Sequence, residues 1–66
     1  MIGFNIRQEE TNITTTVSTS SMVFDLIHKI MNDERVSIEV SSWSEVASVG
    51  DSYDTDHFTV KVIWLM

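Results

Sequence analysis

The sequence predicts an α+β fold: a small, four-stranded, mainly antiparallel sheet (ββαββ) with one amphipathic helix packed on one face. Apolar residues recur at helical spacing over one sustained stretch, Ser20 to Asp33. The segments before and after that stretch alternate apolar and polar residues, which is typical of half-buried strands. A chain of 66 residues is long enough for one hydrophobic core and no more, so we expect a single globular domain, residues 1–66.

The chain begins with two short strand patterns. From Ile2 to Arg7 every second residue is apolar, and Ile13 to Thr19 is rich in β-branched residues, which favour strands. The polar interval between these segments has the length of a hairpin loop. The sequence therefore predicts an antiparallel hairpin at the N-terminal end, with the threonine-rich strand at an edge or in a solvated position.

The predicted helix has an apolar stripe on one side and polar residues on the other. The stripe consists of Val23, Leu26, Ile27 and Ile30, widened by Phe24 and Met31. Three hydroxyl residues in a row are possible N-caps, namely Thr19, Ser20 and Ser21. We expect the helix to end near Asn32 or Asp33, where the chain becomes polar.

The segment after the helix alternates strictly, with Val36, Ile38 and Val40 on one side, which predicts a third strand over Val36–Ser41. The next segment has two interpretations. Ser42 and Glu45 match a capping box, with Gly50 placed to end a short helix. Alternation from Trp43 to Val49 would instead extend the strand, and we favour the irregular or one-turn helical form.

The C-terminal strand is predicted from Phe58 to Met66, after a polar loop over Gly50–His57. Its last residues are apolar on both faces, whereas a single covering helix can bury only one face of a sheet. We therefore expect a homo-oligomer, formed through the uncovered face or an edge. The predicted interface residues are Ile63, Trp64 and Leu65.

Composition limits the partners that the protein can have. The formal charge of −6 disfavours direct binding to nucleic acid, which requires a basic patch, and favours a protein partner with a basic surface. We see no signal peptide and no stretch long enough to span a membrane, so we expect no membrane association and a cytoplasmic location, in the host cytoplasm if a phage encodes the chain.

The sequence indicates no cofactor and no metal site. The chain has no cysteine and only two histidines, which excludes disulfides and thiolate ligands. The loop that carries Asp51, Asp54, Asp56 and His57 lacks the spacing of a calcium-binding loop, so a solvated loop is the better interpretation. No nucleophile elbow or phosphate-binding glycine loop is present, and we expect a protein that is not an enzyme.

The residues expected to contact a partner combine aromatic and acidic side chains in the least regular part of the chain. Aromatic residues dominate interface energetics, and carboxylates match a basic surface. The predicted partner-binding residues are Trp43, Glu45, Asp51, Tyr53, Asp54 and Asp56.

The function expected from these features is that of a non-enzymatic binding protein that occupies the surface of a partner. Small, acidic, cysteine-free chains are frequent among phage-encoded inhibitors of host defence or nucleic-acid-processing proteins, and carboxylates can imitate nucleic-acid phosphates. One alternative is a homo-oligomer that sequesters a small ligand in pockets lined by Trp43 and Tyr53. The other alternative is a structural subunit of a larger assembly.

Overall fold

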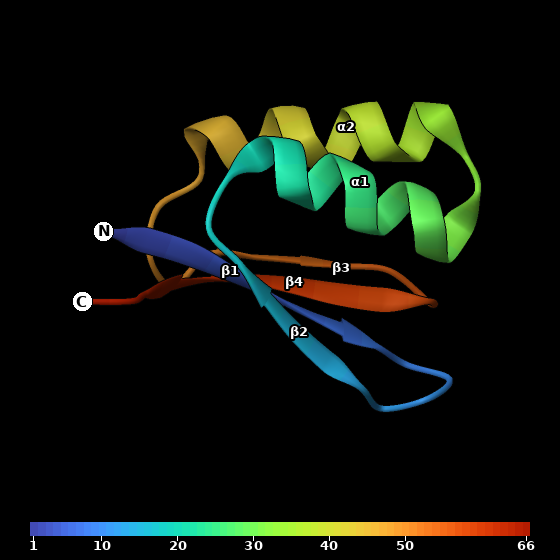
Figure 1. The fold of residues 1–66 in the computed structure, drawn as a ribbon, viewed down its shortest axis with the longest axis horizontal. Coiled ribbons are helices and arrows are strands. Elements are labelled where there is room, and N and C mark those ends of the chain that lie inside the picture. Colours follow the sequence, from blue (N-terminus) through green and yellow to red (C-terminus); the bar gives the residue numbers. More distant parts are fainter.

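The computed structural model describes all 66 residues and has the element order ββααββ (Figure 1). The elements are β1 (Ile2–Gln8), β2 (Thr14–Val17), α1 (Ser20–Met31), α2 (Glu34–Val46), β3 (Ser52–Asp54) and β4 (Phe58–Trp64). The predicted α+β class and the four-stranded antiparallel sheet are confirmed. The prediction of a single helix is wrong, because the chain forms two.

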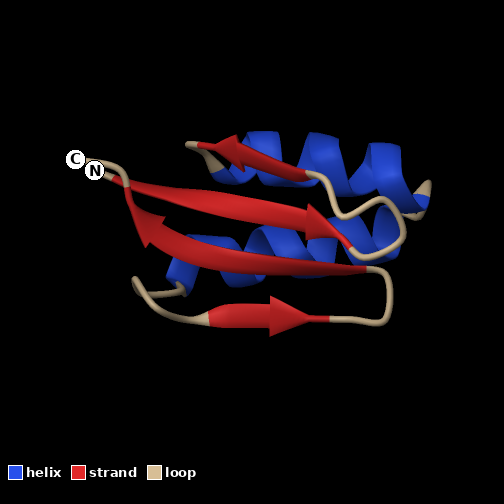
Figure 2. Ribbon diagram, turned by 90° about the horizontal axis from the view of Figure 1, so that it is seen from below, coloured by secondary structure: helices blue, strands red, loops and turns tan.

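The sheet has the strand order β2-β1-β4-β3, and each neighbouring pair is antiparallel. The long strands β1 and β4 form its centre. Their pairing begins with Ile2 opposite Trp64 and ends with Gln8 opposite Phe58. The short strands β2 and β3 form its two edges. Both helices lie on one face of the sheet, and the other face has no covering element (Figures 1 and 2).

Helix α1 confirms the sequence prediction at both ends. Its N-cap is Thr19, whose hydroxyl accepts a hydrogen bond from the amide of Met22 at 3.2 Å. It ends at Met31, followed by Asn32 in the left-handed conformation with φ of 52°, a conformation that asparagine adopts more readily than most residues. The side chains of Val23 and Ile27 are fully buried beneath the helix.

The predicted strand over Val36–Ser41 is wrong, because these residues belong to α2. Alternation would place Ile38 inside, yet its side chain is 50% exposed, whereas Ser37 beside it is fully buried. The helical stripe runs instead through Val36, Val40, Trp43 and Ala47. Ser37 is polar but buried, so a pattern based on hydrophobicity alone assigns it to the outer face and does not show the helical period.

The start of α2 explains why a polar segment follows α1. Asp33 is the N-cap, and its carboxylate accepts a hydrogen bond from the amide of Val36 at 3.2 Å. Glu34 lies in the first turn, where the helix dipole favours negative charge. The helical form favoured for the segment after Ser41 is confirmed as far as Val46, but a separate helix starting near Ser42 is wrong, because α2 already runs through this position.

The two helices pack closely because small hydroxyl residues lie between them. Ser37 and Ser44 are buried, and all buried polar side-chain atoms have hydrogen-bond partners. The Ser44 hydroxyl donates to the carbonyl oxygen of Ser41 at 2.6 Å and is hydrogen-bonded to the hydroxyl of Ser20 at 2.9 Å. These serines therefore bring α1 and α2 together without leaving an unsatisfied polar group.

The core lies between the helix pair and the sheet. Its fully or almost fully buried apolar side chains are Phe4, Ile6, Val23, Ile27, Val40, Phe58, Val60 and Val62. The expected loop before the last strand contains β3, which pairs with β4 through Tyr53 and Val60. Neither helix has the length and apolarity needed to cross a bilayer.

Candidate protein-binding edge

Strand β3 leaves backbone hydrogen-bonding groups free at one edge of the sheet. The amide of Val62 donates to the carbonyl oxygen of Asp51, and the amide of Thr55 donates to that of Phe58, both at 2.9 Å. Because antiparallel pairs alternate between bonded and non-bonded positions, the backbone groups of Ser52 and Asp54 point away from β4. Both residues are exposed, so this edge is open to another chain.

Two aromatic side chains lie beside this edge, on the face that the helices cover. Trp43 of α2 and Tyr53 of β3 have ring centroids 5.4 Å apart in a tilted arrangement. Tyr53 also stacks on the buried ring of Phe58, with centroids 6.5 Å apart. Trp43 and Tyr53 are half-buried and pack against the core, so they support the edge and still present part of their surface to solvent.

The carboxylate of Glu39 adds negative charge at the same place. Partial burial raises the pKa of Tyr53 above its ordinary value of 10.0, and the charge of Glu39 raises the pKa further. Glu39 itself is exposed on α2, one helical turn before Trp43. The aromatic pair therefore has Glu39 beside it on the helix, while Asp54, the next residue of the strand, directs its side chain to the uncovered face at the same edge.

The acidic groups at this edge have no cationic partner within the chain. The one ion pair of the structure joins Arg7 to Glu9 at 2.9 Å. Glu39 and Asp54 therefore make no ion pair, although Arg35 lies one turn before Glu39 on the same helix. Unpaired carboxylates beside open backbone groups can accept hydrogen bonds from lysine or arginine side chains of a partner.

Asp51 has a structural role at the start of this segment. Its carboxylate accepts a hydrogen bond from the amide of Ser48 at 2.9 Å, and its amide donates to the carbonyl oxygen of Ser48 at 2.9 Å. The same turn contains Gly50 with φ of 99°, which a residue with a Cβ adopts only under strain. Asp51 thus holds the turn that leads from α2 into β3.

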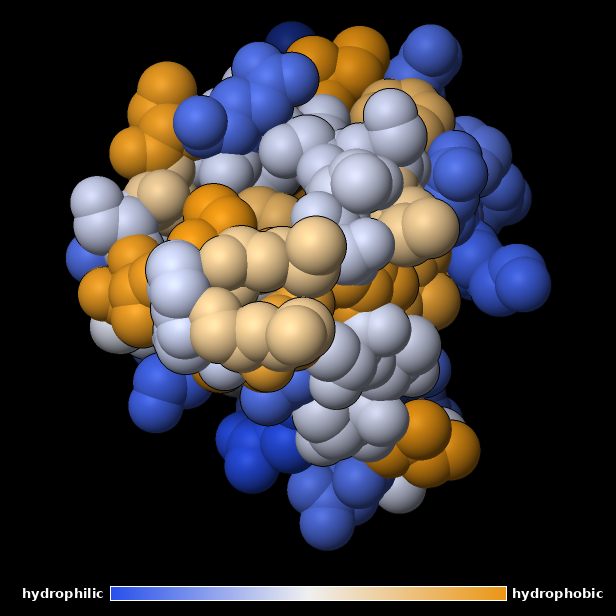
Figure 3. Space-filling model, turned by 60° about the vertical axis from the view of Figure 1, so that its left-hand side comes forward, coloured by the Kyte–Doolittle hydropathy of each residue, from blue (hydrophilic) through white to orange (hydrophobic).

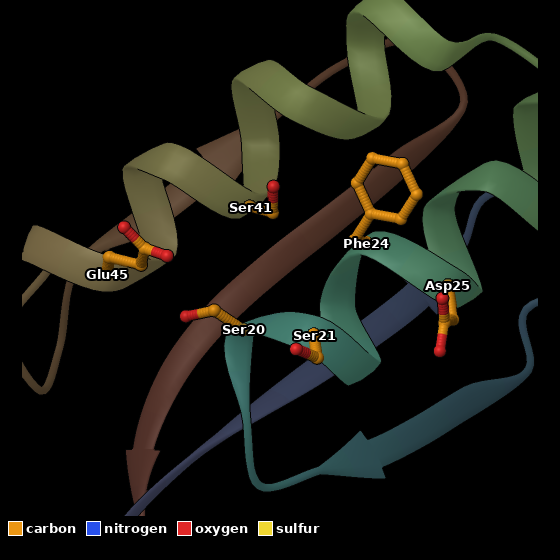
Figure 4. Close-up of a pocket in the computed structure, with 6 residues that line it drawn as sticks. All are labelled: Ser20, Ser21, Phe24, Asp25, Ser41 and Glu45. Atoms are coloured by element: carbon orange, nitrogen blue, oxygen red, sulfur yellow. The ribbon is translucent and has the colours of Figure 1, made fainter.

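Glu45 and Asp56 lie away from the β3 edge. Glu45 lines a shallow groove of about 250 Å³ between the helices, together with Ser20, Ser21, Phe24, Asp25 and Ser41 (Figure 4). Asp56 lines a hollow of about 330 Å³ where the β3–β4 turn meets the β1–β2 loop, together with His57, Glu9 and Glu10. The six residues expected at one partner surface therefore occupy three separate places.

The predicted oligomer residues lie near the chain termini, on two faces of the sheet. Ile63 and Leu65 are half-buried on the uncovered face, and the Leu65 side chain lies directly over Gly3, where a Cβ would be 2.6 Å from its Cδ1. Trp64 belongs to the opposite face and is 63% exposed. Figure 3 views this end of the molecule and shows apolar surface among hydrophilic groups. A role of Ile63, Trp64 and Leu65 in self-association stays a prediction.

The histidines do not converge with other reactive groups. His28 is exposed on α1 and stacks on Phe24 with ring centroids 6.0 Å apart, and His57 lies in the β3–β4 turn. No group of three or more His, Cys, Asp or Glu side chains is arranged to hold a metal ion. Among the residues predicted to contact a partner, Trp43, Tyr53 and Asp54 lie at the β3 edge.

Comparison of the chain with protein families, with curated proteins and with solved structures finds no match.

Sequence reasoning missed Glu39 as a member of this edge. The prediction of a strand over Val36–Ser41 placed Glu39 on the outer face of a sheet, with no relation to Trp43. On a helix the two residues are four positions apart and share one side. The four-residue spacing of Glu39 and Trp43 indicates this shared side, but only after the segment is recognised as helical.

Proposed function

We propose that this protein is a non-enzymatic binding protein that occupies a basic surface of another protein through its β3 edge. The observation that carries the proposal is the open edge at Ser52 and Asp54, next to the half-exposed Trp43–Tyr53 pair and the unpaired carboxylate of Glu39. An extended segment of a partner can add to such an edge as a further strand. Lysine or arginine side chains on that segment would meet the carboxylates.

The charge of the whole chain supports the same choice of partner. A formal charge of −6, with ion pairing limited to Arg7 and Glu9, creates a negative field that attracts basic proteins and speeds their encounter. We propose inhibition as the form of this function, with a phage-encoded chain blocking a host defence or nucleic-acid-processing protein. Proteins that bind nucleic acid carry basic surfaces, which carboxylates can occupy in place of phosphates.

The proposal is tested by affinity capture from a host cell lysate with the whole chain as bait. We expect a basic protein that forms a stable complex with one partner per chain, measured by light scattering on the purified complex. A double variant, Glu39→Gln with Asp54→Asn, removes both carboxylates of the edge and leaves β3 pairing intact. Because each charged contact in a well-packed interface contributes about 1–3 kcal/mol, affinity should fall at least about tenfold.

The matched control is Glu10→Gln with Asp56→Asn, which makes the same change of charge at the hollow beside the β1–β2 loop. This variant should bind almost as well as the original chain. Equal losses in both variants would mean that net charge alone drives binding. A loss confined to the control would move the contact to that hollow and contradict the β3 edge.

The two other functions expected from the sequence stay predictions. None of the three hollows on the surface is lined by Trp43 or Tyr53, so a ligand pocket at these residues would need a second chain to complete it. A small molecule that raised the unfolding temperature without any protein partner would favour that alternative.

A further inference from the structure

The opposite edge of the sheet, strand β2, also has free backbone groups. The amide of Gln8 donates to the carbonyl oxygen of Ile13 at 2.9 Å, which marks that position as a bonded pair of the β1–β2 ladder. By the alternation of antiparallel pairs, Thr15 and Val17 face β1, and the amides and carbonyls of Thr14 and Thr16 point outward. No part of the chain pairs with them.

The two edges differ in charge. The segment from Ile13 to Ser18 contains no charged residue and no proline, which are the usual features that prevent an edge strand from pairing with another copy of itself. The β3 edge carries Asp54 in the strand and Asp51 directly before it, so two such edges would repel each other. The β2 edge is therefore the one suited to self-association.

An apolar groove runs along the β2 edge on the helix side. Its volume is about 240 Å³, and its lining consists of Thr15, Val17, Met22, Asp25, Leu26 and Lys29. The four lining residues from α1 recur every three or four positions, so they form one stripe along the side of the helix at the β2 edge. The side chain of Ile13, on the same face as Thr15 and Val17, is 55% exposed.

We propose that the β2 edge binds a second copy of this chain, with the two β2 strands antiparallel about a two-fold axis at Thr15. In that register Thr14 of each copy lies opposite Thr16 of the other, so the outward amides and carbonyls satisfy one another. Ile13 of each copy lies opposite Val17 of the other and enters its groove. In this register the exposed Ile13 of one copy lies beside the apolar groove of the other copy.

Charge complementarity selects a second copy as the occupant. The two-fold axis brings the α1 helices together in antiparallel directions, and each helix presents Asp25 and Lys29 at the groove. An antiparallel pair sets the acidic side chain of one copy toward the basic side chain of the other. The surface is therefore self-complementary, as a two-fold interface requires.

The dimer would leave both β3 edges free at the outer ends of one continuous sheet. Each dimer would then present two copies of the proposed partner-binding edge, which raises the effective affinity for a partner that has two sites or is itself a dimer. The β2 proposal does not depend on the β3 proposal, because the two edges share no residue.

The test is light scattering of the whole chain across a concentration series. We expect the mass to rise from that of a monomer to that of a dimer, and Ile13→Lys to hold the mass at that of a monomer. The matched control is Ile38→Lys, which makes the same substitution at a residue that is 50% exposed on α2. It should leave dimerisation unchanged. A monomer at all concentrations, or an Ile13→Lys variant that dimerises normally, would overturn the proposal.

A third variant separates this interface from the one predicted at the C-terminal strand. Leu65→Lys should dimerise as the original chain does, and a monomeric Leu65→Lys beside a dimeric Ile13→Lys would place the contact at Ile63–Leu65 instead. Exchanging the charges of Asp25 and Lys29 provides an independent test. Lys29→Glu should weaken the dimer about tenfold, and Asp25→Lys in the same chain should restore it.

Amide hydrogen exchange reads the contact directly. The amides of Thr14 and Thr16 have no acceptor in the monomer, so they should exchange fast in dilute solution and become protected at the concentration where the dimer forms. Protection should be absent in Ile13→Lys at the same concentration. Fast exchange at both positions in a sample of dimer mass would show that the dimer uses another surface.

Discussion

Tyr53 shows how a single residue can belong both to the core and to the surface. Its ring stacks on the buried Phe58 and touches Trp43, while its hydroxyl group lies near the exposed Glu39. A tyrosine suits this position, since its apolar ring can be buried and its polar end can stay near water. The same geometry makes the ionised form of the hydroxyl unfavourable.

The raised pKa of Tyr53 can be measured without interference from other tyrosines, because it is the only one in the chain. We expect the tyrosinate absorbance to develop at higher pH than for a free tyrosine. Glu39→Gln should lower this pKa, since the repulsion by the carboxylate is removed, but not to the ordinary value, since burial remains. An unchanged pKa in Glu39→Gln would place Glu39 away from the hydroxyl.

The same shift predicts the direction of a stability change. The pKa of Tyr53 is higher in the folded chain than in the unfolded one, so folding favours the protonated form. Its contribution is complete below the unfolded value of about 10 and is lost as the pH rises through the folded value. Tyr53→Phe should therefore have a weaker decrease of stability at alkaline pH, measured by urea unfolding.

At the scale of elements, α2 illustrates how a sequence pattern can fit two structures. Val36, Ile38 and Val40 alternate like a strand, but the same segment begins with an N-cap at Asp33 and contains serines at positions that face α1. Hydrophobicity alone cannot tell a buried serine from an exposed one. The packing of two helices decides the matter, because it needs small residues at the contact and supplies their hydrogen bonds.

Two neighbouring apolar residues in α2 test the helical assignment. Val40→Ala should reduce the free energy of unfolding by about 2 kcal/mol, because its side chain is fully buried and its removal leaves a cavity. Ile38→Ala should change stability by less than about 0.5 kcal/mol, since the side chain is half-exposed and alanine favours a helix. Chemical denaturation measures both. Equal losses would instead support the alternating strand.

At the scale of the whole molecule, a small core supports an uneven charge distribution. The chain has ten acidic and four basic residues but only the Arg7–Glu9 ion pair, so like charges repel across a body of about 30 × 23 × 16 Å. Domains of about 60 residues bury only about 60% of the surface of the unfolded chain, so their stability margin is small. Repulsion of this kind is therefore measurable.

We expect salt to stabilise the monomer. The Debye length falls from about 30 Å at about 0.01 M to about 8 Å at about 0.15 M, so added sodium chloride screens repulsion across the molecule. The midpoint of thermal unfolding should rise over this range at a low protein concentration. Glu10→Gln with Glu34→Gln should show a smaller rise. A midpoint that falls with salt would mean that attractive pairs, and not repulsion, dominate the surface.

Local patterns predicted a large part of this fold. The helix near Ser20, a cap among Thr19, Ser20 and Ser21, the strands at Ile2 and Phe58 and the α+β class all follow from spacing and capping chemistry. Strand β3 was not predicted, since three polar residues between turns carry no pattern of their own. It exists because β4 offers it an edge and Tyr53 has Phe58 and Trp43 to pack against.

The candidate site was predicted in its residue types more than in its location. Trp43 and Tyr53 pack together at the β3 edge, where Asp54 also lies, whereas Glu45 faces the groove between the helices and Asp56 lies at the far hollow. Proximity along the chain cannot show which side of a helix or turn a carboxylate will occupy. Glu39 belongs to the site because one helical turn separates it from Trp43. The predicted strand contained no such turn, so the prediction missed Glu39.

The sequence by itself determined the composition of the surface and the positions of the strongest elements, because charge, apolar spacing and capping residues act locally along the chain. Only the tertiary structure decided which face of α2 is buried, that Ser52–Asp54 forms a strand, and which backbone groups stay open at the two edges. These properties arise from pairing and packing between segments that are distant in the chain, and no local pattern encodes them.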